Sequence, residues 1–400
     1  MFSAKQNEYF YNAVHRWNVK SGATRSGKTY MDYFVIPKRL RAVSGKDGLN
    51  VILGNTKGTL QRNIIEPLQS LWGVKYVSDI HSDNTATMFG EKVYCLGADK
   101  INQVDRLRGS SIKYCYGDEV VTWHEDVFSM LKSRLDKEYS RFDGTCNPEN
   151  PNHWFKKFID SDVDIYLQEY TLDDNPFLPE AFKENLKKEY YGTVFYDRYI
   201  LGKWVPAEGL IYKLLADNPQ RFMIKRSKLP PLHSVIAGVD WGGNKSGHAI
   251  VCSGIGNDNR LYFIKAKYAK AAGSTADELI RWCVAAFDDI YKEIGIFFEI
   301  YADSAEQVLI NSLREKTHYS VFNSIKRPIV DRIRVLNILL STDRVRFVEG
   351  ETEELVEAFS SAVWDDKKMD DVRLDNGSYN NDIIDAAEYS FEYNIDWLVN

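Results

Sequence analysis

Residues Gly22 to Thr29 read Gly-Ala-Thr-Arg-Ser-Gly-Lys-Thr, a complete G-x-x-x-x-G-K-[ST] pattern. Glycines allow the tight turn by which backbone N–H groups face phosphate oxygens. The Lys28 ammonium can reach β- and γ-phosphates, and the Thr29 hydroxyl can ligate Mg²⁺. The alternative is a chance glycine-rich turn. The pattern predicts an ATP phosphate-binding loop made of Gly22, Ala23, Thr24, Arg25, Ser26, Gly27, Lys28 and Thr29.

A pair of acids follows a strand-like run further along the chain. Residues 112–116 are mostly apolar and lead into Gly117-Asp118-Glu119. We expect this strand to lie beside the strand that precedes the phosphate loop, which would bring both acids to the nucleotide. Asp118 is then expected to bind ATP through the Mg²⁺ shell, and Glu119 to polarise the attacking water.

Two further features extend this nucleotide site. Arg25 lies inside the phosphate loop, where it can neutralise charge on the γ-phosphate in the transition state, unless it is an arginine exposed to water. Thr145-Cys146-Asn147 follows another strand-like run. Polar residues there can sense the γ-phosphate and transmit its loss.

Aspartates in the second half of the chain form another set. Asp240 ends an apolar strand and precedes Trp241-Gly242-Gly243, and Asp303 ends another strand. Asp382 and Asp385 lie three residues apart, on one face of a predicted helix. Hard cations prefer such oxygen ligands. Two metals roughly 3.5–4 Å apart can activate water and stabilise the leaving oxygen of a phosphodiester.

These four aspartates therefore predict a nuclease with two Mg²⁺ or Mn²⁺ ions. The small Ala386 and Ala387 would let their helix lie close to a sheet. The alternative is that each aspartate has a separate structural role, in a turn, a helix cap or the surface.

Composition sets the frame for these sites. A chain of 400 residues is long for one core, so two domains are expected. The net charge of -6 gives no global sign of nucleic-acid binding, although gathered carboxylates would lower it. Five scattered cysteines argue for a reducing cytoplasm and against disulfides or a zinc cluster. The sequence contains no run of about 18 or more apolar residues, so it predicts no membrane span.

Strand-like runs alternate with helical stretches in the first half, which predicts an α/β fold with a mostly parallel sheet between helices. The helix after the phosphate loop is expected to end at Pro37. Strand-like runs at 234–240, 249–252 and 261–264 predict a three-stranded meander. The expected organisation is an ATPase domain at 1–205, a proline-containing linker at 206–232 and a nuclease domain at 233–400.

Taken together, these segments resemble the large terminase subunit of tailed bacteriophages, over nearly the whole chain. The resemblance rests on 22–29, Leu107-Arg108-Gly109 with 116–119, 144–154, 174–178, 201–205, 238–242, 302–306 and 382–386.

The resemblance implies a P-loop ATPase followed by a ribonuclease-H-like α/β nuclease. Residues Thr145, Cys146 and Asn147 would form the coupling motif, and Gln6 would correspond to an adenine-contacting glutamine. It stays open whether Arg25 acts in its own subunit or in a neighbour, and whether Asp382 or Asp385 is the stronger metal ligand.

The resemblance also implies a DNA-packaging motor. Such a protein uses ATP and Mg²⁺ for its ATPase, and Mg²⁺ or Mn²⁺ for cutting concatemeric double-stranded DNA. Its expected partners are the portal protein and a small terminase subunit, with a ring on the procapsid, a monomer in solution and no membrane. Its expected location is the cytoplasm of the infected bacterial host.

Two other functions remain possible on the sequence alone. A helicase-nuclease of DNA repair would need a second motor domain, whereas the part after residue 205 carries the aspartates. An ATP-dependent DNA-binding or assembly protein with a vestigial second domain would not cut. Metal-dependent cleavage separates it from the nuclease hypothesis.

Overall fold

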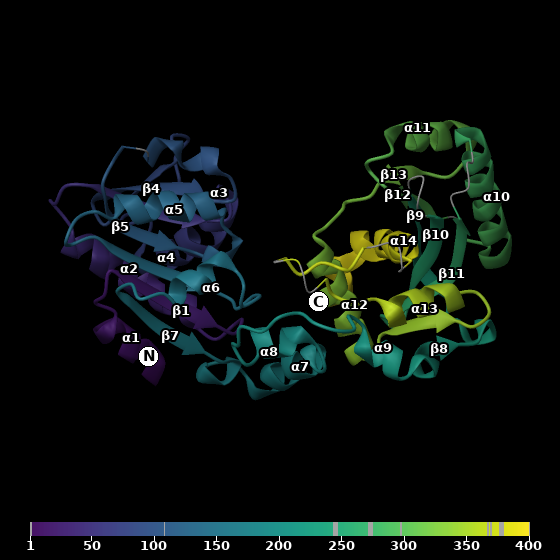
Figure 1. The fold of residues 1–400 in the computed structure, drawn as a ribbon, viewed down its shortest axis with the longest axis horizontal. Coiled ribbons are helices and arrows are strands. Elements are labelled where there is room, and N and C mark those ends of the chain that lie inside the picture. The colour runs from purple at the N-terminus through teal and green to yellow at the C-terminus, as the bar shows by residue number, and fades with distance from the viewer. Residues whose placement is uncertain are drawn as a thin grey trace. The chain divides into compact units, whose positions relative to one another are not determined.

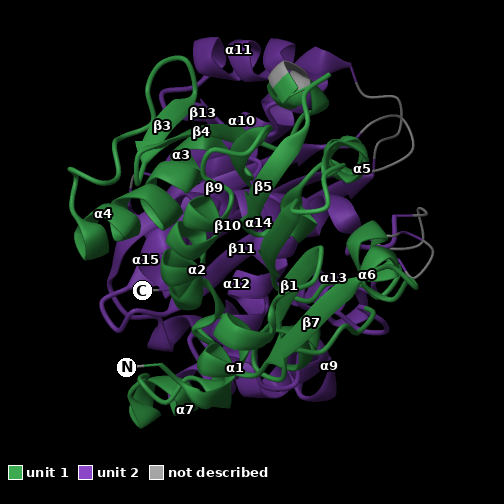
Figure 2. Ribbon diagram, turned by 90° about the vertical axis from the view of Figure 1, so that its left-hand side faces the viewer, with its two compact units in different colours: residues 1–184, 194–206 green, residues 185–193, 207–400 purple. Residues whose placement is uncertain are grey.

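The computed structural model divides the chain into two compact units (Figure 2). Unit 1 holds residues 1–184 and 194–206, and unit 2 holds residues 185–193 and 207–400. The structure describes residues 2–107, 109–242, 247–270, 275–296, 298–365, 368, 370–375 and 380–399, with only the backbone of 105 and 106. Arg108 and Gly243, which belong to the sequence motifs, lie outside these ranges.

One sheet organises unit 1, with its strands in the order β3-β4-β2-β5-β6-β1-β7. Neighbouring strands are parallel, except that β3 pairs antiparallel with β4 at the edge. The strands are β1 (Trp17–Gly22), β2 (Leu49–Gly54), β3 (Thr85–Met88), β4 (Glu91–Gly97), β5 (Ile112–Gly117), β6 (Arg141–Cys146) and β7 (Ile165–Tyr170).

Helices cover both faces of this sheet (Figure 1). Side chains along β2 alternate between the faces: Val51 and Leu53 join the core under α5 and α6, whereas Ile52 joins the core under α2 and α4. The helices are α1 (Ala4–Asn12), α2 (Lys28–Ala42), α3 (Lys57–Leu60), a π-helical turn (Gln61–Ile65), α4 (Glu66–Trp72), α5 (Glu125–Arg134), α6 (Trp154–Ile159) and α8 (Val194–Tyr199). Helix α7 (Glu180–Tyr190) begins in unit 1 and ends in unit 2. The expected α/β class with a mostly parallel sheet is confirmed.

Helix α2 corrects one expectation, because it continues through Pro37 to Ala42 instead of ending there. Proline lacks the N–H that would bond the carbonyl four residues earlier. That carbonyl belongs to Tyr33, and it accepts a hydrogen bond from Trp72 Nε1 at 2.9 Å. A donor from α4 thus replaces the missing helical one.

A mixed sheet organises unit 2, in the order β13-β12-β9-β10-β11-β14-β8. Strands β9, β10 and β11 pair antiparallel in sequence order, which confirms the predicted meander, and the outer strands add in parallel. The strands are β8 (Met223–Ile224), β9 (Leu232–Trp241), β10 (Gly247–Gly256), β11 (Leu261–Lys270), β12 (Glu299–Ala302), β13 (Val321–Asn323) and β14 (Val345–Val348).

The helices of unit 2 include one that lies unusually close to the sheet. A Cβ atom on Gly238 of β9 would stand 1.9 Å from the Ala386 carbonyl oxygen, so only glycine permits this approach of α14. The helices are α9 (Lys213–Asp217), α10 (Ala276–Ile294), α11 (Gln307–Lys316), α12 (Ile329–Ser341), α13 (Glu353–Ser361), α14 (Asn381–Phe391) and α15 (Ile395–Val399). Among the residues the structure describes, no helix is long and apolar enough to cross a membrane.

The segment expected to be a linker has structure of its own. Residues 207–232 belong to unit 2, where they form α9 and where β8 pairs with β14. The physical reason is burial: Tyr212, Leu215 and Phe222 are fully buried between the prolines. These apolar side chains contribute to the core of unit 2, whereas a solvated linker would expose them.

Candidate nucleotide and carboxylate sites

The predicted phosphate loop follows β1 and leads into α2, as its motif requires. Gly22 lies so close to β7 that a Cβ atom would stand 2.1 Å from the Tyr170 carbonyl oxygen. Gly27 has φ of 86° at the N-cap of α2, a left-handed conformation that favours glycine. Both glycines of the motif therefore serve the backbone path of the loop.

Neighbouring segments hold this loop in place. Ala23 N donates to the Tyr170 carbonyl at 2.8 Å, and Asn175 Nδ2 donates to the Arg25 carbonyl at 2.8 Å. Arg25 itself is exposed and has φ of 56°, an uncommon conformation for a non-glycine residue. Its side chain points to no partner that the described residues provide, while Thr29 is half-buried.

Gln6 contacts the phosphate loop directly. Its Nε2 donates to the Gly27 carbonyl at 2.8 Å, and its Oε1 accepts from Ser3 N at 2.9 Å. The side chain is buried. The Nε2 end of this amide therefore fastens α1 to the phosphate loop, and the Oε1 end caps the start of α1.

The Lys28 ammonium lies inside the loop and bridges it to the segment after β6. It donates to the carbonyls of Gly22 at 3.2 Å and Ala23 at 2.9 Å, and to Asn147 Oδ1 at 2.7 Å. Burial lowers the pKa of Lys28 to about 8, although Cys146, Glu119 and Asp118 oppose that change.

The order of strands corrects a second expectation. Strand β5, which Asp118 and Glu119 follow, does not lie beside β1, because β6 is inserted between them. All three strands are parallel, so their carboxyl ends still meet at one edge of the sheet. Asp118 and Glu119 therefore lie two strands from β1 and its phosphate loop, with the end of β6 between them.

Thr145, at the end of β6, links the two acids. Its Oγ1 donates to Asp118 Oδ1 at 3.2 Å and accepts from Glu119 N at 3.3 Å. Burial and the neighbouring Glu119 charge raise the pKa of Asp118 to about 6. Glu119 is exposed and has φ of 49°, so its backbone is held in a strained conformation.

Sequence reasoning missed a tyrosine in this site. Tyr116 points its hydroxyl at Asp32 Oδ2, at 3.1 Å, and at Asp118 Oδ1, at 3.5 Å. Asp32 is fully buried and paired with Lys20 at 2.5 Å. Tyr116 lies in the buried, mostly apolar strand β5, so the sequence pattern indicated a core residue and not a polar contact. The Cys146 side chain, in contrast, lies in the apolar core below the site.

In unit 2, three of the predicted aspartates come from elements packed together. Asp240 lies in β9, Asp303 follows the adjacent β12 with its N–H on the Val239 carbonyl at 3.0 Å, and Asp382 opens α14. Burial raises the pKa of Asp240 well above its usual value, and the charges of Asp385, Asp303 and Asp382 raise it further. The four predicted carboxylates thus form one electrostatic cluster.

Asp385 differs from the other three, because two arginines hold it. Its Oδ1 accepts from Arg373 Nη2 at 2.5 Å and from Arg332 Nη1 at 3.3 Å. The same arginines pair with the fully buried Glu388, at 2.6 Å and 2.7 Å. Asp382 instead accepts from Gly247 N at 2.6 Å.

The chemistry of this donor set suits Mg²⁺ or Mn²⁺, since it consists of carboxylate oxygens that repel one another until a cation joins them. Within the described ranges, no three residues among Asp, Glu, His and Cys are grouped closely enough to hold a metal ion. Three cations pair with two of these carboxylates. Lys326 pairs with Asp303, and the arginines pair with Asp385.

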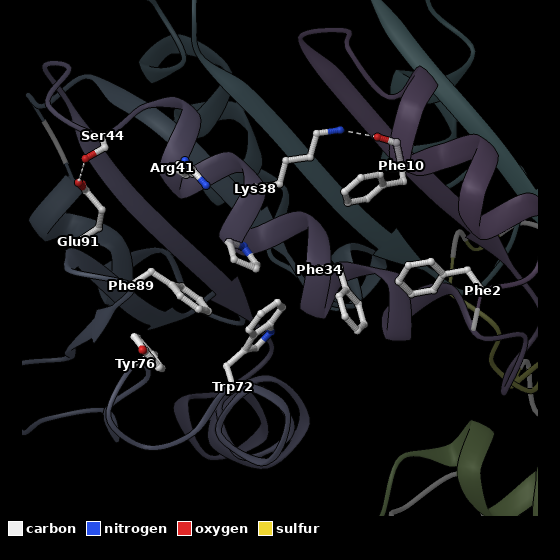
Figure 3. A pocket seen from close by; sticks show the side chains of 11 residues that line it. Phe2, Phe10, Phe34, Lys38, Arg41, Ser44, Trp72, Tyr76, Phe89 and Glu91 are labelled. Atoms are coloured by element: carbon white, nitrogen blue, oxygen red, sulfur yellow. Dashed lines mark hydrogen bonds between the residues drawn. The ribbon is translucent and has the colours of Figure 1, made fainter.

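A separate cavity of about 650 Å³ lies on unit 1 (Figure 3). Aromatic rings from α1, α2, α4 and the turn before β4 line it, among them Phe34, Trp72 and Phe89. Trp72 packs edge-to-face on both of the others. The cavity therefore follows the outer side of α2, the helix that begins at the phosphate loop.

Comparison with known proteins finds a matching family and structures of similar fold. The family described as "Terminase large subunit, T4likevirus-type, N-terminal" matches residues 20–216. The large terminase of a thermophilic bacteriophage superposes with a TM-score of 0.83 at 24% identity, covering 97% of this chain and 98% of that chain. No curated protein matches the sequence.

Two further structures of the same thermophilic-phage protein contain nucleotides. Its complex with ADP superposes with a TM-score of 0.80 at 25% identity, and its complex with ATP-gamma-S with a TM-score of 0.78 at 25% identity. Each covers 97% of this chain and 98% of that chain. The chain belongs to the family of phage large terminase subunits, the ATPase and nuclease components of DNA-packaging motors.

Proposed function

We propose that this protein drives viral DNA into a procapsid by ATP hydrolysis in unit 1 and cuts concatemeric DNA by a metal-dependent endonuclease in unit 2. Family membership supports both activities, and the nucleotide complexes of the thermophilic-phage terminase support the first. The ATPase role falls to the expected domain at 1–205, and the nuclease role to 233–400.

In the nucleotide site, each residue has a role that its position allows. Lys28 leaves Asn147 to bind the β- and γ-phosphates, and Thr29 and Asp118 hold Mg²⁺, which neutralises phosphate charge when bound. Glu119 orients the attacking water. Arg25, exposed at the loop, stabilises charge on the γ-phosphate, in its own subunit or across to a neighbour.

The coupling segment reports the state of the nucleotide through two contacts. Thr145 touches Asp118 and Glu119, and Asn147 touches Lys28. Loss of the γ-phosphate returns Lys28 to Asn147, so the end of β6 responds to hydrolysis. Cys146 contributes to this segment through its backbone, since its side chain is buried.

In the carboxylate site, we assign Asp240, Asp303 and Asp382 as ligands of divalent metal, which supplies activation of water and stabilisation of the leaving oxygen. Asp385 is a positioning residue, because Arg332 and Arg373 already neutralise it. This assignment favours Asp382 over Asp385 as the stronger ligand.

The remaining functions follow from the same proposal. The substrate is double-stranded DNA, and the working form is a ring on the portal of the procapsid, with a monomer in solution. A small terminase subunit selects the DNA. The site of action is the cytoplasm of the infected bacterium.

The observation that carries the ATPase proposal is the position of Thr145 between Asp118 and Glu119, at the edge where the phosphate loop opens. Its test is ATP hydrolysis by Glu119→Gln, with the exposed Glu125→Gln as the matched control. We expect Glu119→Gln to bind ATP but to hydrolyse it about 10²–10⁴-fold more slowly. Normal hydrolysis by this variant would refute the assignment.

A further inference from the structure

The loop between β13 and α12 places a cation beside the carboxylate site. Lys326 pairs its ammonium with Asp303 Oδ1, and its side chain is 39% exposed while that of Asp303 is 16% exposed. In the sequence, Lys326 belongs to a basic stretch with Arg327, Arg332 and Arg334, and such a stretch is usually a solvated surface. Here it contacts a predicted metal ligand.

The backbone of this loop is held in an unusual conformation. Lys326 has φ of 53°, in the left-handed region that non-glycine residues rarely adopt. Such strain persists only where the surrounding structure imposes it, and it gathers at functional sites. The conformation therefore needs a cause.

Glu392 supplies that cause. Its fully buried carboxylate accepts three successive backbone N–H groups: Ile325 N at 2.7 Å, Lys326 N at 3.1 Å and Arg327 N at 3.2 Å. Consecutive N–H groups that converge on one anion form a nest. Glu392 directly follows α14, the helix that carries Asp382. One helix thus brings both a candidate ligand and the clamp for the Lys326 loop.

The β13 end of this loop is tied to both residues that flank Asp303. Ser324 N donates to the Ala302 carbonyl at 2.7 Å, and Ser304 N donates to Ser324 Oγ at 3.2 Å. The neighbouring Arg327 points elsewhere, to Asp396 at 3.2 Å. Of these two adjacent cations, only Lys326 reaches the carboxylate cluster.

We propose that Lys326 takes the place of a divalent cation at Asp303 and is exchanged for it when metal binds. The proposal rests on the assigned nuclease site. A single ammonium compensates part of the repulsion among Asp240, Asp303 and Asp382, and it occupies the Asp303 Oδ1 atom that a metal would use. Its flexible, partly exposed chain lets it leave. Metal then binds only at concentrations that outcompete the lysine, which restrains cutting.

The test measures Mn²⁺ binding to the full chain without nucleotide. The readout is the electron paramagnetic resonance signal of free Mn²⁺. Lys326→Ala removes the competitor, and we expect it to bind Mn²⁺ about fivefold more tightly than the wild type, in keeping with a partly exposed ion pair. Lys326→Arg, which keeps a charge, should bind more like the wild type.

Arg327→Ala is the matched control, because it removes the same charge one residue away. It should change Mn²⁺ affinity by less than about twofold, since its charge is screened and paired elsewhere. Asp303→Asn identifies the site and should lose the tight binding.

The outcomes separate the inference from the proposed function. If Asp303→Asn abolishes Mn²⁺ binding but Lys326→Ala binds no more tightly than the wild type, or no more tightly than Arg327→Ala, the exchange is refuted and the nuclease site stands. If neither the wild type nor Lys326→Ala binds Mn²⁺, both the exchange and the nuclease assignment fail.

Discussion

The Lys28 ammonium donates a 2.7 Å hydrogen bond to Asn147 Oδ1, which joins the phosphate loop to the end of β6. These residues lie 119 positions apart in the sequence. The contact occupies the same donor that the γ-phosphate requires, so nucleotide binding and the conformation of Asn147 are linked.

Asn147→Asp should weaken ATP binding. The new carboxylate would pair with Lys28 and repel the incoming phosphates, for an expected loss of about tenfold, or roughly 1.4 kcal/mol. Asn147→Ala, which only removes an acceptor, should bind ATP no more weakly than the wild type. Isothermal titration with ATP measures both, and Asn152→Asp, at an exposed position, controls for charge. Equal affinity in all variants would disprove the link.

Thr145→Val should slow hydrolysis more than it weakens binding. Valine keeps the shape but removes the Oγ1 that contacts Asp118 and supports the strained Glu119 backbone. We expect kcat to fall about 10–100-fold, within the range of a displaced general base, with the Kd for ATP nearly unchanged. Thr87→Val on the exposed edge strand is the control. A variant that changes Kd and leaves kcat intact would contradict this role.

A buried ion pair should set the acid stability of unit 1. Burial alone would raise the pKa of Asp143, but the Arg39 guanidinium at 2.7 Å holds it below its usual value. Asp143→Asn leaves Arg39 without its charge partner, and at pH 7 the free energy of unfolding should fall by about 3–5 kcal/mol.

The pH dependence follows from the sign of that shift. A carboxyl group with a depressed folded-state pKa stabilises the protein above its unfolded pKa of about 3.9, and this contribution is lost as the pH falls below that value. The difference between wild type and Asp143→Asn in urea unfolding should therefore be constant above about pH 5 and shrink in stronger acid. A difference that grows in acid would show that the pair is not the source.

Trp72 should stabilise α2 by supplying the hydrogen-bond donor that Pro37 lacks. Trp72→Phe removes the donor to the Tyr33 carbonyl and should cost about 1 kcal/mol of unfolding free energy. Pro37→Ala restores a helical N–H for the same carbonyl. In that background Trp72→Phe should cost clearly less, which thermal unfolding of the four proteins in a double-mutant cycle measures. If the two substitutions change the free energy of unfolding additively, Trp72 and residue 37 do not compete for the Tyr33 carbonyl.

Short sequence patterns correctly predicted the structural features that depend on residues close together in the chain. The phosphate loop, the acids after β5, the meander and the close approach of Ala386 to a sheet all follow from short segments of sequence. Strand order does not, because the insertion of β6 between β1 and β5 depends on pairing between distant segments.

Features that depend on distant partners escaped the sequence for the same reason. The sequence predicted that α2 ends at Pro37, because the hydrogen bond from Trp72 to the Tyr33 carbonyl joins residues distant in the chain. The role of Asp385 depends on Arg332 and Arg373, which lie on separate elements. Lys326 and Glu392 lie 66 positions apart, and neither carries a motif.

The most direct test of the two-site account is cleavage of supercoiled plasmid by the full chain with Mn²⁺, beside ATP hydrolysis by the same preparations. We expect Asp303→Asn to lose cleavage and keep ATP hydrolysis, and Lys28→Ala to lose hydrolysis and keep metal-dependent cleavage. Cleavage that persists in Asp303→Asn, or that needs Lys28 when no ATP is present, would contradict the assignment of cutting to the carboxylates of unit 2.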